Sequence, residues 1–590
     1  MEDQNKNNYF SIEKKKETLA IILLGFFVFE VTFCYLLFML NVEIFKNTLL
    51  ISYIVYVIIL FVTFTLKKVD KKHITSILLT FTLLSAFIYL SGIFFFSQTY
   101  DTSWDGQGYH SSGVISFAQG WNPIYDKELP INLSDAEIFV QGYPKALWLI
   151  QSTFYVSIGT INAAKVTNLI AMLIALIYTY CLLRNFKISK PYSILLAIIC
   201  VAPAHVLMQL FSFMQDGFIY QMLVCAIAAL GLFIMRSSPI SLLGFIFSLL
   251  LLAGTKYSAL PMVLILSGVF AIIVFKKIMH KVIHYDSKKG LLIGNKSYLN
   301  NKWKLIYAIS FIITLIFFSI PYISNTIKYH DPVYPANDPV INKSYEANNI
   351  PTNIQDKDKL SLLFYGIFSK SQVDSGGSSD SPQNIAVLKL PFTFSFDETT
   401  NAIDMFNNRV GSVGPLFSGI FLLSLIIVIF QYKNIKHENK KYLYIVYSCI
   451  IVIILSNLFN PVPNLIRYNG QILLIPIIVA VSILTLSRTK NKLLVTLNVF
   501  LIFSLYINAV LFSVPLFQGR AEGITNINKQ LSEMNRSNKK YYVKANNFYS
   551  HYIRLSENDI NYEIVDKLPC KEPIPLVKSI DTTKICVSNI

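Results

Sequence analysis

The chain has 590 residues, of which 54% are hydrophobic and only 14% are charged, and its formal net charge is +17. This composition excludes a soluble protein, because many apolar runs reach about 20 residues, the length that spans the ~30 Å hydrocarbon core of a bilayer. The positive charge does not indicate nucleic-acid binding, because most lysines fall in short loops between apolar runs, where they set membrane orientation.

Apolar runs follow one another along most of the chain and predict an all-α polytopic membrane protein with about thirteen transmembrane helices. When the runs are counted in order, the basic loops all fall on one side of the membrane, and this agreement supports the number. The expected spans are residues 19–40, 49–66, 74–96, 164–183, 192–210, a sixth ending at 236, 240–253, an eighth ending at Lys276-Lys277, 305–323, 415–430, 442–458, a twelfth ending near 488, and 493–512.

The loops rich in lysine orient the chain, because such loops stay in the cytoplasm. They place the N-terminus in the cytoplasm and the C-terminal tail outside, in the periplasm or at the cell exterior. Residue usage rich in isoleucine, lysine and asparagine indicates a bacterium, so the plasma (inner) membrane is expected. We divide the chain into residues 1–73 (a cytoplasmic tail and two additional helices), 74–512 (a membrane core with outer loops 97–145 and 325–413) and 513–590 (an exterior domain).

The polar tail carries short strand signals. Residues 541–543 and 562–565 alternate between apolar and polar side chains, which predicts a small exterior α/β domain. Cys570 and Cys586 lie in this tail, and an oxidising compartment allows a disulfide between them. Spacing alone does not give the geometry of a bridge, so both the bridged and the free state stay open.

The most informative polar stretch is the first outer loop, which contains Asp101, Asp105, Tyr109 and His110. Asp105 is followed by glycine, a pattern typical of a turn that starts a helix. From there Asp105 and Tyr109 would share one helix face, and the helix would end near Gly120. Two interpretations fit the stretch: a catalytic centre beside the membrane, or a solvated loop whose aspartates cap a helix.

Further polar residues gather on the predicted outer side. Carboxylates supply a general base, and interfacial cations bind phosphate. A transferase with a lipid-linked phospho-sugar donor needs both, because the base deprotonates the acceptor and the cations bind the leaving phosphate. The outer residues that topology does not explain are Asp101, Asp105, His110, Lys145, Asp216, Lys256, His330, Asp331, Arg409 and Arg467.

Several of these residues have a structural alternative. Asp101 is a partner of Asp105, a metal ligand or a helix cap, and Asp216 also suits a helix N-terminus. For His110 we favour a packed, hydrogen-bonded histidine. Lys145 and Lys256 could extend their amines to lipid headgroups, and Arg467 either binds phosphate or anchors the chain at the interface.

In their order and outer placement, these motifs resemble the GT-C superfamily of polytopic glycosyltransferases, in particular the bacterial protein mannosyltransferase and aminoarabinose transferase group. The resemblance covers about residues 74–490. Two features depart from the family pattern: two additional spans precede the acidic loop, and His330-Asp331 replaces a Gly-Asn pair. The matching segments are Asp105–His110, Tyr143-Pro144, Gln215–Gly217, Thr255–Tyr257, Tyr329–Pro335, Gly411–Phe417 and Arg467-Tyr468.

The resemblance implies transfer of a sugar from a polyprenyl-phosphate donor to a glycolipid, glycan or protein acceptor, with Asp105 as general base and inversion at the anomeric carbon. Asp101 and Asp216 would be further catalytic residues. A divalent metal is used by some members, and the first loop alone shows no complete ligand set. The expected substrate-binding residues are Tyr109, His110, Lys145, Lys256, Arg409, Arg467 and Tyr468.

Three other functions remain open. A polymerase or ligase of lipid-linked oligosaccharides would rely on arginines of the late outer loop, such as Arg409. A transporter or flippase would place charges inside the spans, facing a cavity, whereas the spans are nearly free of them. A structural membrane protein would use its outer loops only to bind partners, and the effect of replacing Asp105 separates it from an enzyme.

Overall fold

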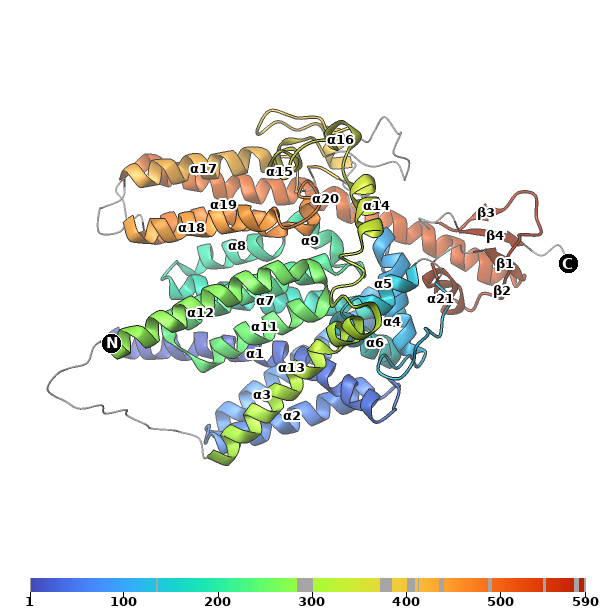
Figure 1. The fold of residues 1–590 in the computed structure, drawn as a ribbon, viewed down its shortest axis with the longest axis horizontal. Coiled ribbons are helices and arrows are strands. Elements are labelled where there is room, and N and C mark those ends of the chain that lie inside the picture. Colours follow the sequence, from blue (N-terminus) through green and yellow to red (C-terminus); the bar gives the residue numbers. More distant parts are fainter. Residues whose placement is uncertain are drawn as a thin grey trace.

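A computed structural model of the chain describes residues 2–133, 136–283, 301–371, 385–400, 409–411, 413–434, 440–486, 491–544, 548–577 and 583–587. The protein is mostly helical, with one small sheet near the C-terminus. Figure 1 shows the long helices running roughly side by side, with short helices and the sheet gathered at one end. We call this end of the bundle the site end; it holds the sheet and the short helices η2 (Gly106–His110), α4 (Ser111–Ala118), α5 (Glu137–Gly142) and α14 (Pro339–Asn349).

Within the described residues, seven helices are long and apolar enough to cross a membrane, and each coincides with a predicted span. Shorter apolar helices occupy further predicted positions, so the total of about thirteen stays a prediction. Residues 284–300, in the most basic predicted loop, lie outside the described residues. The seven are α1 (Glu2–Met39), α2 (Thr48–Leu66), α3 (Lys71–Phe94), α7 (Val166–Asn185, preceded by η4, Ile161–Lys165), α10 (Asp216–Arg236), α12 (Leu260–Ile283, preceded by η5, Tyr257–Ala259) and α20 (Lys492–Ser537).

Two groups of helices form the bundle. In the first, α1 packs against α7 and α11 (Pro239–Thr255), and α10 packs against α7 and α11. The first helix therefore contributes side chains to the hydrophobic core. The second group contains α17 (Phe417–Asn434), α18 (Lys440–Asn457), α19 (Leu474–Leu486) and α20, and contacts of α20 with α8 (Lys190–Val201) and α9 (Ala204–Gln209) join the groups.

Close helix packing depends on small residues in the first group. A Cβ atom at Gly244 of α11 would meet the Tyr178 hydroxyl of α7 at 2.2 Å, and one at Gly25 of α1 would meet the Tyr56 hydroxyl of α2 at 2.6 Å. A larger residue at either position would force the tyrosine side chain to move. Small residues serve this purpose in membranes, where packing rather than hydrophobic burial brings helices together.

The loops of the site end fold into short helices. The acidic loop starts with η1 (Phe96–Gln98) and forms a π-helical turn, η2 (Gly106–His110), that continues as α4 (Ser111–Ala118). This confirms the helix predicted to begin after Asp105 and to end near Gly120. The other elements are α5 (Glu137–Gly142), α6 (Ala146–Ile158), α13 (Asn301–Tyr329), α14 (Pro339–Asn349), η6 (Thr352–Ile354), α15 (Lys359–Phe368), α16 (Phe396–Thr400), η9 (Ile466–Tyr468) and η10 (Gly470–Leu473).

The C-terminal domain is joined to the bundle by one continuous helix. α20 runs past the predicted boundary at residue 513 as far as Ser537, so the last apolar helix and the domain share one element (Figure 1). Beyond it, four strands form a sheet in the order β2-β1-β4-β3, with β1 parallel to β2 and antiparallel to β4. The two predicted strands are confirmed. The elements are β1 (Tyr541–Lys544), α21 (Ser550–Ser556), β2 (Tyr562–Ile564), β3 (Ile574–Pro575) and β4 (Lys584–Val587).

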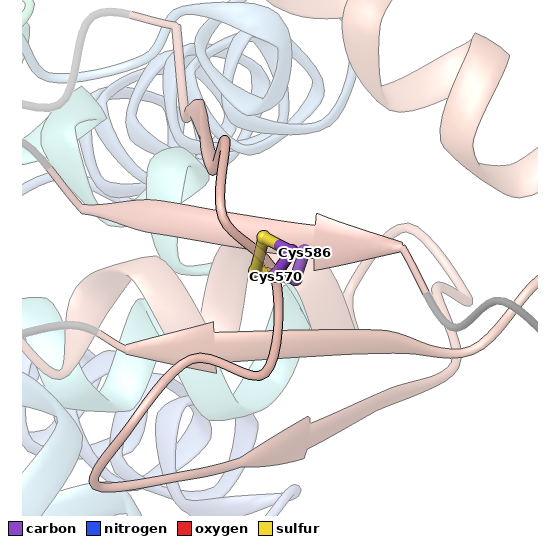
Figure 2. Close-up of a disulfide and its surroundings, with 2 residues drawn as sticks. All are labelled: Cys570 and Cys586. Atoms are coloured by element: carbon purple, nitrogen blue, oxygen red, sulfur yellow. A yellow bond between two sulfur atoms is a disulfide. The ribbon is translucent and has the colours of Figure 1, made fainter.

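A disulfide joins Cys570 to Cys586 (Figure 2). Cys586 belongs to β4, whereas Cys570 lies in the segment between β2 and β3. The bridge therefore ties an irregular segment of the domain to its sheet, and the structure resolves the question that the spacing left open.

We expect Cys586→Ser to destabilise the C-terminal domain by about 3 kcal/mol, because the bridge closes a loop of 16 residues in the unfolded chain. Limited proteolysis of the purified protein with and without reductant measures this effect. Cys449→Ser, which replaces an exposed free cysteine, is the control and should leave the proteolysis rate unchanged. Equal sensitivity of wild type and Cys586→Ser without reductant would contradict the bridge.

Candidate functional site

A cavity of about 1090 Å³ opens at the site end of the bundle. Its wall comes from segments far apart in the sequence: the acidic loop, the start of α10, the turn between α11 and α12, residues 333–349 and residues 456–471. Many of its polar side chains come from the motifs that the sequence singled out. The polar and charged lining residues include Asp105, Tyr109, Tyr143, Asp216, Lys256, Tyr345, Arg409, Arg467, Tyr468 and Gln471.

Asp105 forms an ion pair with Arg467 at the wall of the cavity. Oδ2 of Asp105 lies 3.2 Å from Nη2 of Arg467, and each side chain is 13% exposed. The same Nη2 donates to the Tyr468 hydroxyl at 2.8 Å. The carboxylate thus comes from the start of η2 and the guanidinium from η9, which are separated by 362 residues.

A second ion pair joins Asp216 to Lys256. Nζ of Lys256 lies 2.9 Å from Oδ1 of Asp216, and the side chains are 7% and 3% exposed. Asp216 is the first residue of α10, where the helix dipole favours a negative charge. Its other oxygen, Oδ2, is buried and has no hydrogen-bond partner among the described residues, so it can accept a proton or a hydrogen bond from a ligand.

The two ion pairs meet at the ring of Tyr468. Nζ of Lys256 lies 4.5 Å from the ring centroid, and Cζ of Arg467 lies 4.6 Å from it. Cations at this distance from an aromatic ring are attracted to it. Two carboxylates, two cations and one phenol therefore form a compact, charge-balanced cluster, which we call the Tyr468 cluster.

Tyrosines form the rest of the polar wall. The rings of Tyr109 and Tyr143 meet edge to face at 5.7 Å, and Tyr345 lies 6.1 Å from Tyr468. Burial raises the pKa of Tyr143 to about 12 and that of Tyr109 well above its usual value. These phenols stay protonated at neutral pH and can donate hydrogen bonds to a bound anion.

Asp101 is buried but does not line the cavity. Its Oδ1 accepts from the backbone N–H and the hydroxyl of Ser103 at 2.8 and 2.7 Å, and its Oδ2 accepts from the Phe213 N–H at 2.6 Å. It thus ties the acidic loop to the turn that precedes α10. Asp101 therefore bonds loop backbone and does not cap η2 or α10, and a catalytic role for Asp101 stays a hypothesis without a contact to the cavity.

His110 and Lys145 also lie behind the cavity wall. Nδ1 of His110 accepts from Nε1 of Trp148 at 3.2 Å, and the ring is fully buried, as expected for a packed histidine. Lys145 donates to the carbonyls of Gln141 and Tyr143 at 2.8 Å each, and burial lowers its pKa to about 7. Both residues position the acidic loop and the Tyr143 turn.

The proline-rich segment after α13 lies against that same turn. Nδ2 of Asn325 donates to the carbonyls of Gly142 and Tyr334 at 2.8 Å each. A Cβ atom at Gly142 would meet Pro335 at 2.7 Å, so only glycine fits. Residues 333–337 line the cavity in part, whereas His330 and Asp331 do not.

The described part of the chain shows no set of side chains arranged as metal ligands. Among the residues that the structure describes, no group of three histidine, cysteine or acidic side chains is arranged to hold a metal ion. Asp101 and Asp105 do not share a ligand position, because Asp101 accepts from Phe213 while Asp105 pairs with Arg467.

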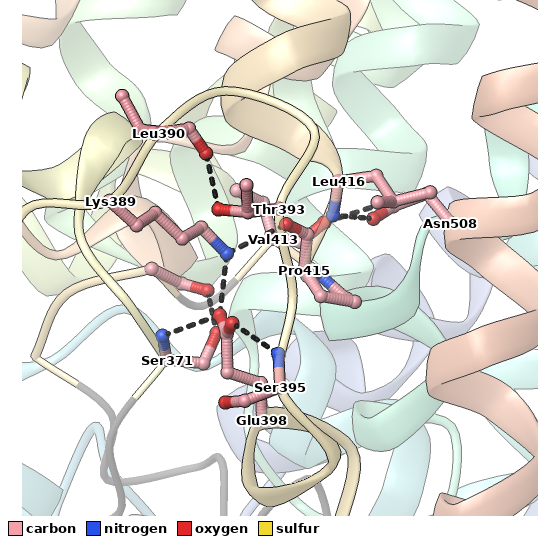
Figure 3. Close-up of polar contacts among 11 residues, drawn as sticks. Ser371, Lys389, Leu390, Thr393, Ser395, Glu398, Val413, Pro415, Leu416 and Asn508 are labelled. Carbon is pink, nitrogen blue, oxygen red and sulfur yellow. Dashed lines mark hydrogen bonds and ion pairs between the residues drawn. The ribbon is translucent and has the colours of Figure 1, made fainter.

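The second outer loop is tied to the bundle by a buried ion pair, which sequence reasoning missed. Lys389 and Glu398 are 4% and 2% exposed, and Lys389 also donates to the Pro415 carbonyl at 2.7 Å (Figure 3). Glu398 accepts from the Ser371 N–H at 3.1 Å, and the Ser371 hydroxyl donates to Gly411. These bonds fix residues 409–411 and therefore place Arg409 at the cavity.

Other residues at the site gave weak signals in the sequence. Trp104 and Tyr345 line the cavity, but nothing in their local patterns distinguishes them from interfacial aromatics. The pair of Lys389 and Glu398 could not be found either, because an ion pair nine residues apart has no periodic signature. Its only signal was the unusual length of the loop.

Comparison with protein-family models, with curated proteins and with solved structures finds no match to this chain. A functional assignment therefore depends on the cavity and on its charged residues.

We expect Glu398→Gln to destabilise the protein by about 3–5 kcal/mol, because it leaves the buried ammonium of Lys389 without its counter-charge. Thermal unfolding in detergent measures the loss. Glu563→Gln is the matched control, because Glu563 pairs with Lys540 at the surface, and it should leave the unfolding temperature nearly unchanged. Equal unfolding temperatures for both variants would contradict the structural role of the buried pair.

The stability of the site end should fall in acid. Burial holds the pKa of His110 well below its usual value of about 6.5, so the unfolded chain takes up a proton below that pH while the folded chain does not. We expect this residue to contribute a loss of about 1.4 kcal/mol per pH unit below ~6.5. Unfolding of wild type and His110→Phe between pH 7.5 and 5.0 measures it. The variant should show a smaller slope, and replacement of the exposed His73 should not change it.

Proposed function

We propose that the protein is a polytopic membrane glycosyltransferase of the GT-C type, which moves a sugar from a polyprenyl-phosphate donor to an acceptor on the outer face of the membrane. The observation that carries the proposal is the Tyr468 cluster on the wall of a cavity at one end of an apolar bundle. It combines a carboxylate suited to act as a base with two cations suited to bind phosphate.

The reaction uses these groups in a defined order. The donor phosphate approaches Arg467 and Lys256, and Arg467 exchanges its contact with Asp105 for one with phosphate, which it can bind bidentately. Asp105 then accepts the proton of the acceptor hydroxyl. The acceptor oxygen attacks the anomeric carbon, the bond from that carbon to the phosphate oxygen breaks, and polyprenyl phosphate leaves with both electrons. Attack opposite the leaving group inverts the anomeric centre.

Asp216 has a supporting part in this scheme. It neutralises Lys256 before the donor arrives, and its unpartnered Oδ2 can accept a hydrogen bond from a sugar hydroxyl. Tyr109, Tyr143 and Tyr468 donate hydrogen bonds to the phosphate oxygens or the sugar. The acceptor is a glycolipid, a glycan or a protein.

The apolar part of the cavity suits the lipid portion of the donor. Leu260, Pro261 and Met262 line the cavity at the start of α12. This helix has many exposed apolar side chains, including Leu264 at 71% and Phe275 at 63%, which a bilayer would cover. A prenyl chain can therefore lie along α12 while its phosphate reaches Lys256.

The proposal includes a membrane topology. The N-terminus lies in the cytoplasm of the plasma (inner) membrane, about thirteen helices cross the membrane, and the site end and C-terminal domain lie outside. The ends of helices support this arrangement. α10 starts at the cavity with Asp216 and ends at Arg236, at the opposite end of the bundle. There Arg236 donates a hydrogen bond to Asn185, the last residue of α7, near the basic loop that follows this helix.

A second function is kept open by Arg409. A polymerase or ligase of lipid-linked oligosaccharides would use arginines of the late outer loop, and Arg409 lines the cavity.

Transport has less support. It predicts intramembrane charges that face a cavity, whereas the buried Glu30 of α1 accepts a hydrogen bond from Ser52 and does not line the cavity.

We expect Asp105→Asn to lower transfer by roughly a hundred- to ten-thousandfold, because asparagine keeps the size of the side chain and removes the base. Mass spectrometry of cell-envelope glycolipids and glycans measures the product. A single missing sugar mass supports the transferase and names the sugar class, whereas loss of whole repeats supports the polymerase. Asp356→Asn, at an exposed carboxylate of the second outer loop, is the control. Unchanged glycans at equal protein level would sink the proposal.

A further inference from the structure

The C-terminal domain contacts the acidic loop directly. The hydroxyl of Ser550 donates to the Gln107 carbonyl at 2.7 Å, and Nε2 of His551 lies 2.7 Å from Oε1 of Gln107. Both partners come from the start of α21, more than 440 residues further along the chain. Gln107 and His551 are buried, at 2% and 0% exposure. Two hydrogen bonds from the C-terminal domain therefore reach the turn that follows Asp105.

A packing contact accompanies these bonds. A Cβ atom at Gly108 would lie 3.0 Å from the ring of Phe548, so the ring lies flush on the loop backbone. The ring of Phe548 also meets Trp104 edge to face, with centroids 5.4 Å apart. The domain therefore contacts the residue before Asp105 and the residues two and three places after it.

The hydrogen bonds of His551 give its ring one orientation. Oε1 of Gln107 can only accept, so Nε2 of His551 carries the hydrogen. Nδ1 then accepts from the hydroxyl of Thr583, which lies 2.6 Å away. The ring is thus fixed between the acidic loop and the residue that precedes β4.

The acidic loop needs such external support. Gly106 and Gly108 flank Gln107, and glycine leaves the backbone free to adopt many conformations. The segment forms a π-helical turn, a rare geometry that local hydrogen bonds favour less than an α-helix. A neighbour that binds Gln107 from outside removes this freedom.

We propose that His551 is a positioning residue of the active site, which holds Gln107 and thereby keeps Asp105 aimed at the cavity and at Arg467. The C-terminal domain is then part of the catalytic unit. The inference rests on the proposed function, because only a reaction at Asp105 makes the aim of that side chain matter. Without the bond, the turn opens more often and the carboxylate spends less time in its productive position.

Hydrogen exchange on the full-length protein tests the physical part without any substrate. We expect His551→Ala to speed amide exchange in residues 106–112 by roughly tenfold, because it removes the buried hydrogen bond between His551 and Gln107. Glu557→Gln is the matched control. Glu557 also joins the C-terminal domain to the bundle, through the Ile161 N–H at 2.7 Å, and among the described residues it makes no hydrogen bond to residues 106–112. Unchanged exchange in His551→Ala overturns the inference.

Product formation per folded molecule tests the functional part. We expect His551→Ala to lower kcat by roughly tenfold with little change in the donor KM, and His551→Gln to recover part of the rate, because its amide can donate to Gln107. Glu557→Gln should keep the wild-type rate. An equal loss in Glu557→Gln would show that docking alone matters and would overturn the inference. If Asp105→Asn itself changes no product, the proposed function fails, and the exchange result still decides whether His551 orders the loop.

Discussion

The site depends on charges held out of water at the end of an apolar bundle. Asp105, Asp216, Lys256 and Arg467 are all largely buried, and burial of an isolated charge is costly unless a partner compensates it. The two ion pairs provide this compensation, and the Tyr468 ring contacts both cations. Because Lys256 and Arg467 each have a carboxylate partner, the Tyr468 cluster is charge-balanced, and an entering phosphate competes for these cations. In the proposed reaction this exchange couples donor binding to release of the base.

Several separate devices bring these four side chains together. Asp101 bonds the acidic loop to the turn before α10, and Asn325 bonds the Tyr143 turn to the proline-rich segment. The ion pair of Lys389 and Glu398 fixes the second outer loop against α17. None of these groups needs to touch a substrate. They position irregular backbone accurately, because each gives a buried polar group a hydrogen-bond or ion-pair partner from another segment.

The C-terminal domain is also held against the bundle by contacts between distant segments. α20 passes from the apolar helices into the domain without a break, so the position of the sheet is set by a rigid element. The domain in turn contacts the loop that carries Asp105 through Phe548 and His551. The sequence suggested a membrane part followed by a separate tail. It did not reveal the contact between the domain and the acidic loop, because this contact joins residues more than 440 positions apart.

The sequence by itself determined the helical membrane class, the positions of the long apolar helices, the helix that begins after Asp105 and the two tail strands. These features follow from local patterns, namely the length of apolar runs, periodicity and turn residues. It also selected Asp105, Asp216, Lys256 and Arg467, because membrane topology does not explain these outer charges, and it selected Tyr468 through the family resemblance of the Arg467-Tyr468 pair. Tertiary structure alone decided which charges pair, that Asp101 serves the backbone rather than the cavity, and that His551 contacts the acidic loop. Such contacts depend on how distant segments pack, and no local pattern encodes them.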